Sequence, residues 1–84
     1  MIKKVVTMSE AGLQASPIAM LVQKASQFSS SVHIEAENRK VNAKSLMGMM
    51  TLAVRGGDVI TVITEGADEE VAANEIEAYL NAQV

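Results

Sequence analysis

Polar and apolar residues alternate in four separate stretches of the chain. The alternation is loose in IKKVVTM (residues 2–8) and regular in VHIE (residues 32–35), which a polar turn at residues 37–39 separates from KVN (residues 40–42). The run DVITVIT (residues 58–64) is the richest in β-branched residues. Successive side chains of a strand point to opposite faces, so these stretches predict four strands, of which the middle two form a hairpin.

Three further stretches repeat their apolar residues at the spacing of an α-helix. They predict helices over residues 16–28, 46–54 and 68–80. Ser16 is the expected N-cap of the first helix, and Gly56-Gly57 are expected to end the second. The third helix begins with a run of acidic residues, which the positive end of the helix dipole favours.

The predicted elements follow the order βαββαβα. A chain of 84 residues has room for one core, so the apolar faces of all three helices must be buried against the same sheet. The short strands and the hairpin favour a mainly antiparallel sheet. We therefore expect one domain over residues 1–84, an open-faced α/β (α+β) sandwich whose four-stranded sheet is covered on one face by three helices.

Composition narrows the function classes. The net charge is −3 and the only arginines are Arg39 and Arg55, which argues against direct nucleic-acid binding. There is no cysteine and a single histidine, so we expect no disulfide, no metal site and no cofactor. The longest largely apolar stretch, residues 46–54, is too short to cross a bilayer, and the N-terminus lacks the pattern of a signal peptide. We expect a cytoplasmic protein whose partners are proteins.

Two motifs carry a resemblance to a known family. KVNAKSLMGMMTLAV (residues 40–54) is similar, almost position by position, to the regulatory-serine segment of HPr, the small phosphocarrier of the bacterial sugar phosphotransferase system. GLQASP (residues 12–17) resembles the active-site loop of that family, which has the form G-[IL]-H-A-R-P. The resemblance extends over the whole chain, and it implies an HPr-like fold.

The second motif departs from the family at its two reactive positions. Gln14 stands where the resemblance places the phosphorylated histidine, and Ser16 stands where it places the arginine that holds the phosphoryl group. An amide nitrogen shares its lone pair with the carbonyl and is no nucleophile, and Ser16 carries no charge. The glutamine is similar to the Crh branch of the family, the HPr-like catabolite-repression proteins of certain Gram-positive bacteria, but Ser16 departs from that branch too. We expect no catalytic residue and no enzymatic activity.

Ser45 is the candidate for regulatory phosphorylation. It directly precedes the second predicted helix, where a serine is a favourable N-cap. The resemblance implies that HPr kinase/phosphorylase phosphorylates it with ATP. The phosphoprotein would then act as a corepressor with a LacI-type catabolite control regulator in carbon catabolite repression. For the neighbouring Lys44 two roles are open, a solvated side chain or one that helps to neutralise the phosphate.

The residues around the two motifs are the candidates for partner binding. The second predicted helix has more large apolar side chains than one buried face needs, so some of them must be exposed. The resemblance implies one docking surface that contains Gln14, Ser16, Met20, Gln23, Leu46, Met47 and Met50. Flexible methionines suit a surface with several partners, although methionines that only fill the core are the alternative.

Two other functions stay open. A phosphocarrier with an atypical site would have to use Ser16 or His33 as its phosphate acceptor. His33 is expected in the middle of a strand, pointing away from the core, with no arginine next to it. The other possibility is an unphosphorylated docking module that titrates the partners of genuine HPr. Ser16 favours this module, because without the arginine the chain lacks a contact to an acidic partner residue. The sequence leaves the oligomeric state open.

Overall fold

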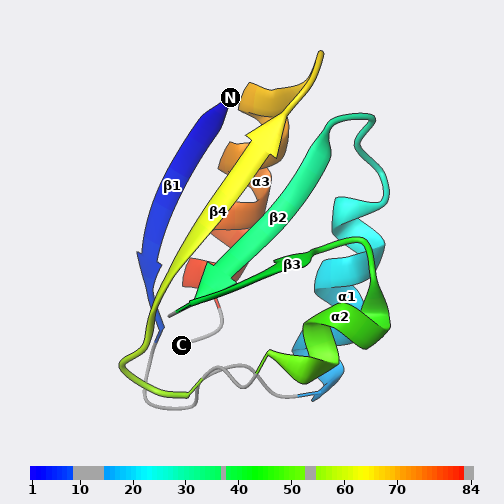
Figure 1. The fold of residues 1–84 in the computed structure, drawn as a ribbon. Helices are drawn as coiled ribbons and strands as arrows, with labels where there is room; N and C mark the ends of the chain where they lie inside the picture. The colour runs from blue at the N-terminus through cyan, green and yellow to red at the C-terminus, as the bar shows by residue number, and fades with distance from the viewer. Residues whose placement is uncertain (9–14, 37, 53–54, 83–84) are drawn as a thin grey trace.

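The computed structural model describes residues 1–8, 15–36, 38–52 and 55–82, and Figure 1 shows their arrangement. Seven elements follow one another: β1 (Ile2–Thr7), α1 (Ala15–Ala25), β2 (Ser31–Ala36), β3 (Arg39–Asn42), α2 (Leu46–Thr51), β4 (Val59–Glu65) and α3 (Glu69–Asn81). The order βαββαβα is the one that the sequence predicts.

The four strands form one sheet in the order β1-β4-β2-β3, and all three pairings are antiparallel. In register, Val6 of β1 lies opposite Ile60 of β4, and Val62 of β4 lies opposite Ile34 of β2. All four of these side chains are buried. The alternation in the sequence therefore gives one buried face along the centre of the sheet, as expected for a sheet covered on one side.

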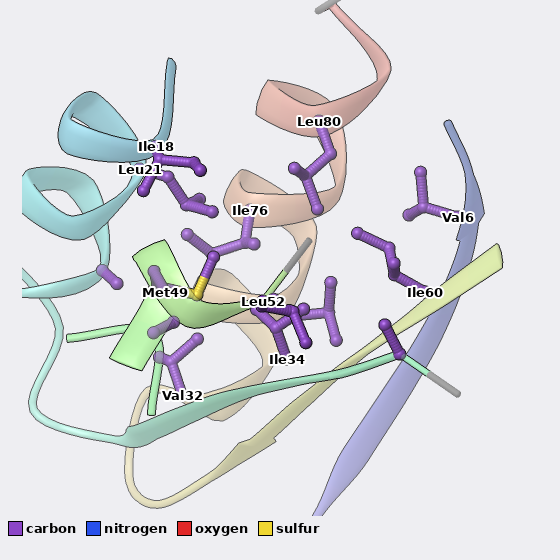
Figure 2. Close-up of a cluster of buried hydrophobic side chains, with 14 of the residues drawn as sticks. Val6, Ile18, Leu21, Val32, Ile34, Met49, Leu52, Ile60, Ile76 and Leu80 are labelled. Atoms are coloured by element: carbon purple, nitrogen blue, oxygen red, sulfur yellow. The ribbon is translucent and has the colours of Figure 1, made fainter. Parts of the chain in front are cut away.

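The three helices cover that buried face (Figure 1). Helix α3 packs on β1, β4 and β2, α2 packs on β3, and α1 packs against both other helices. The core between them is almost wholly aliphatic. Its largest fully buried apolar side chains are Leu21, Val32, Ile34, Met49, Ile60, Val62 and Ile76. Figure 2 shows Met49 of α2 within this cluster, near Ile76 of α3. The predicted open-faced sandwich is confirmed.

The opposite face of the sheet holds the only histidine. His33 lies in β2 between the buried residues Val32 and Ile34, so its side chain points to the open face, where it is half-buried. Its partners in register are Asn42 on β3 and Ile63 on β4. The prediction that His33 points away from the core is confirmed, but its surroundings are partly apolar.

A polar cluster joins the segment between α1 and β2 to the start of α3. The Asp68 carboxylate accepts hydrogen bonds from the Ser29 N–H (3.0 Å), the Ser30 N–H (2.9 Å) and the Ser30 hydroxyl. The Asp68 N–H in turn donates to Ser30 Oγ (3.1 Å). These bonds, the one from the Ser30 hydroxyl foremost, stabilise the carboxylate and lower the pKa of Asp68 to about 2. The sequence indicated only an acidic helix start here.

Candidate functional site

Ser45 is the N-cap of α2, as the sequence predicts. Its backbone is extended (φ −103°, ψ 112°), and its Oγ accepts a hydrogen bond from the Gly48 N–H at 3.1 Å. Its carbonyl accepts the first hydrogen bond of the helix, from Met49 N at 2.9 Å. The residue itself is exposed. The hydroxyl therefore lies at the surface in a fixed position, where a second molecule can reach it.

The turn before Ser45 is tied to the sheet. The Asn42 side-chain oxygen accepts from Lys44 N (2.8 Å), and the Asn42 carbonyl accepts from Ser45 N (3.0 Å). Between them, the fully buried Ala43 donates its N–H to the carbonyl of Val32 in β2 (2.8 Å). The position of Ser45 is thus set by strands β2 and β3 as well as by its own helix.

The Lys44 side chain has a specific partner within the protein. Its Nζ donates to the carbonyl of Phe28, just beyond the end of α1, at 2.7 Å. Neither role left open by the sequence describes this contact, in which an ammonium stabilises a carbonyl at the end of a helix. The contact also places the beginning of α2 beside the C-terminal end of α1.

Helix α2 ends earlier than predicted, at Thr51 rather than near Val54. Leu52 is extended (φ −88°, ψ 100°) and buried, so the chain leaves the helix to place this side chain in the core. Arg39 of β3 stabilises the end, because its guanidinium donates to the Thr51 carbonyl at 2.9 Å and to Thr51 Oγ1 at 3.2 Å. The predicted stop at Gly56-Gly57 is wrong, and Ala53 and Val54 lie outside the described residues.

Apolar side chains of the two neighbouring helices are exposed to solvent. The exposed fractions are 58% for Met20 of α1 and 48%, 82% and 54% for Leu46, Met47 and Met50 of α2. Met49, in the middle of the same short helix, is fully buried. We call Met20, Gln23, Leu46, Met47 and Met50 the docking surface; Gln23 is exposed as well. These methionines are not core filler, and the structure brings the five residues onto two helices that pack together.

The loop motif lies at the other end of α1. The helix begins at Ala15, two residues before the predicted first helical position at Pro17, so Ser16 is inside its first turn rather than at the N-cap. Gln14 and the side chain of Ser16 lie outside the described part of the chain. An 11-residue helix is about 16 Å long, and Lys44, the neighbour of Ser45, contacts the carbonyl of Phe28 beyond the opposite end of this helix.

Helix α3 holds the start of α1 in place. The Tyr79 hydroxyl donates to the Pro17 carbonyl at 2.7 Å, and partial burial raises the pKa of this phenol. Tyr79, three residues of α1 (Met20, Gln23 and Lys24) and Gln27, just beyond the end of that helix, line a shallow hollow of about 230 Å³. Lys24 is also ion-paired with Glu75 of α3 at 3.2 Å. The hollow adjoins the docking surface at Met20 and Gln23.

Two kinds of site are missing from the described residues. No three of their histidine and acidic side chains are grouped so as to hold a metal ion. None of their helices has the length and apolar character of a membrane span. Neither finding adds another candidate functional site to the surface formed by α1 and α2.

A model of the HPr component of the phosphotransferase system, described as its phosphorylation site, matches residues 2–82. The chain belongs to the HPr family. It is 46% identical over 81 residues to the HPr-like protein Crh of Halalkalibacterium halodurans, and this match covers 96% of both chains. The HPr-like protein Crh of Bacillus subtilis is 45% identical over 82 residues, which cover 98% of this chain and 96% of the relative.

The structure of an HPr protein confirms the fold. The phosphocarrier protein HPr from Bacillus anthracis matches this chain with a TM-score of 0.88 and 45% sequence identity. The match covers 94% of this chain and 95% of the other. The seven elements and their antiparallel sheet are therefore an HPr fold, in which Ser45 and the docking surface lie on the side formed by α1 and α2.

Proposed function

We propose that this HPr-family protein is a Crh-like regulatory phosphoprotein and not a phosphocarrier or an enzyme. HPr kinase/phosphorylase transfers phosphate from ATP to Ser45. The phosphorylated chain then binds a LacI-type catabolite control regulator and acts as its corepressor in carbon catabolite repression, in the cytoplasm. One observation carries the proposal. The chain keeps the full regulatory-serine segment, residues 40–54, but has Gln14 in place of the histidine that carries phosphate.

The loop chemistry supports the loss of phosphate transfer. A phosphocarrier needs a neutral imidazole nitrogen as its nucleophile, and the Gln14 amide offers none. The family's arginine would hold the phosphoryl oxygens through charge-assisted bonds, and Ser16 in its place has no charge. His33 is a poor substitute. It lies in the middle of β2 between Asn42 and Ile63, neither of which is cationic.

The geometry at Ser45 supports its role as acceptor. The hydroxyl is exposed, and the turn before it is held by hydrogen bonds to β2 and β3. A phosphoserine carries a charge of about −2, which the free N–H groups at the start of a helix stabilise by about 0.3–1 kcal/mol. Lys44 donates to the Phe28 carbonyl. With that bond intact, the phosphate charge is left for basic residues of a partner.

The docking surface supports binding to proteins. Its exposed leucine and methionines give a partner apolar area next to a phosphorylated Ser45, and methionine side chains adapt to different partners. The net charge of −3 does not favour direct contact with DNA, so an effect on transcription would act through the regulator.

Intact-mass spectrometry tests the proposal. The protein is incubated either with ATP and an HPr kinase/phosphorylase or with phosphoenolpyruvate and enzyme I, and Ser45→Ala is treated in the same way. We expect one phosphate from ATP, none from phosphoenolpyruvate and none on Ser45→Ala. The singly phosphorylated protein should then bind the regulator more tightly than the unmodified protein.

Two other results would contradict the proposal. Phosphate from phosphoenolpyruvate would indicate a phosphocarrier with an atypical acceptor, which mutation of His33 and Ser16 would locate. Phosphate from neither donor would favour an unphosphorylated docking module that titrates HPr partners. The uncharged Ser16 is the observation that favours this second function.

A further inference from the structure

Gly48 lies against the Ser45 hydroxyl. Its N–H donates to Ser45 Oγ at 3.1 Å, and a Cβ atom added at position 48 would lie 3.3 Å from that oxygen and 3.4 Å from Ser45 Cβ. The next atom that such a Cβ would meet is the carbonyl oxygen of Asn42, at 3.7 Å. Residue 48 is therefore in direct contact with the hydroxyl, and any side chain at this position would crowd it.

Neither the backbone nor the core explains a glycine at this position. Gly48 is inside α2, and its φ is not among the positive values, which Gly57 and Gly66 have. Alanine would stabilise a helix interior by about 1 kcal/mol relative to glycine. The three atoms nearest to an added Cβ all belong to the cap residue and the turn before it, not to a core side chain. Position 48 thus carries a residue that weakens its helix and leaves free space beside Ser45.

Phosphoryl transfer needs that space. In the proposed reaction, Ser45 Oγ forms a bond to the γ-phosphorus of ATP, the bond from this phosphorus to the β–γ bridging oxygen breaks to give ADP, and the hydroxyl proton leaves to a base on the kinase. The nucleophile and leaving group must be in line, and the phosphorus brings three more oxygens close to Oγ. A methyl group 3.3 Å from Oγ would occupy part of this volume or force the hydroxyl to rotate.

We propose that Gly48 is a specificity-determining residue for the phosphorylation of Ser45. It acts by leaving the hydroxyl open to the γ-phosphate and does not contact the core. This inference rests on the proposed function and adds to it a steric requirement, which is that the third residue after the acceptor serine has no side chain.

The test compares wild type, Gly48→Ala and Ser45→Ala as substrates of HPr kinase/phosphorylase with ATP. We expect kcat/KM for Gly48→Ala to fall at least tenfold. Its thermal midpoint should stay within a few degrees of wild type, because the helix preference of alanine offsets the weakening of the Ser45 cap bond. The matched control is Val71→Ala, which changes an exposed side chain of α3 outside the docking surface. Gly48→Ala should also inhibit wild-type phosphorylation, with a Ki near the KM of the wild type, because the docking surface is unchanged.

The outcomes separate this inference from the proposed function. If wild type takes no phosphate from ATP, the proposed function fails and the role of Gly48 fails with it. If wild type and Gly48→Ala are phosphorylated at similar rates and Ser45→Ala is not, the proposed function holds and only the inference is wrong. A Gly48→Ala protein that no longer competes with wild type, or that melts far below it, would also overturn the inference, because its defect would then be structural.

Discussion

Met49 and Met50 are neighbours in α2 with opposite surroundings, so the same truncation at each position separates the core from the docking surface. Met49 is fully buried and lies in the aliphatic cluster near Ile76 (Figure 2). Met50, in contrast, is 54% exposed. Met49→Ala removes three heavy atoms from a closely packed interior and leaves a cavity. Met50→Ala removes the same atoms from a surface.

The expected costs differ severalfold. Truncation of a buried methionine to alanine lowers the free energy of unfolding by about 2–5 kcal/mol, while a surface substitution changes it by about 0.5 kcal/mol or less. The total for a domain of 84 residues is on the order of 4–13 kcal/mol. Met49→Ala therefore removes a large share of the stability, and its thermal midpoint should fall by about 10 °C or more.

Urea denaturation followed by far-UV circular dichroism suits this test, because the chain has no tryptophan and a single tyrosine for fluorescence. Both variants are compared with wild type at the same pH and salt concentration. A cost below about 1 kcal/mol for Met49→Ala would contradict the assignment of this residue to the core. An equal cost for Met50→Ala would show that its side chain supports the fold and would remove it from the docking surface.

Three further substitutions test contacts that join distant segments. The pKa of Asp68 is lowered from 3.8 to about 2, so the contribution of this carboxylate to the free energy of unfolding is complete above pH 3.8 and is lost as the pH falls through 2. Across this range the urea midpoint should therefore fall more steeply for wild type than for Asp68→Asn. Equal slopes would contradict the contact between Asp68 and Ser30. Lys44→Met leaves the carbonyl beyond α1 without its charged donor and should cost about 1–2 kcal/mol in urea denaturation, whereas a cost near zero would mean that water replaces the ammonium. In Gly66→Ala the new Cβ would lie 2.8 Å from the Cα atom of Ser30 at a φ of +146°, so thermal melting should show a loss of about 2 kcal/mol or more. The control Gly57→Ala, also at positive φ but with nothing within 4 Å, should lose less.

The strands were predictable because each one buries a single face. Every second side chain of such a strand points to the core, so apolar residues recur at every second position of the sequence. The predicted bounds of β2, β3 and β4 differ from the observed ones by no more than one residue at each end. The helical periods placed α1 and α3 for the same reason. The hydrophobic period does not show where contacts with other parts of the chain end a helix or strand. Helix α2 stops at Thr51 because Leu52 is drawn into the core and Arg39 of β3 bonds the last carbonyl.

The contacts that the sequence did not reveal join residues that lie far apart along the chain. Ser30 and Asp68 are 38 positions apart, and Pro17 and Tyr79 are 62 apart. No local propensity or spacing encodes such a pair. At the candidate site, the N-cap role of Ser45 is local and was predictable, whereas the separation of Met49 from Met47 and Met50 depends on how α2 sits against β3 and α1. The motif resemblance anticipated that separation, and periodicity alone did not.

The charges near the two ends of α1 affect which partner surfaces the protein would attract under the proposed function. Phosphorylation of Ser45 would change the net charge from −3 to about −5, next to exposed methionines and without a new positive group at its side while Lys44 donates to Phe28. At the other end, Ser16 removes a positive charge that the family's arginine would present to an acidic partner. Both differences weaken attraction to acidic surfaces and strengthen attraction to basic ones, over distances of about 8–10 Å at physiological salt.

A partner that recognises the phosphorylated chain must therefore combine basic groups opposite Ser45 with apolar area opposite Met47 and Met50. Under the proposed function, partners that rely on the family's arginine would lose part of their affinity.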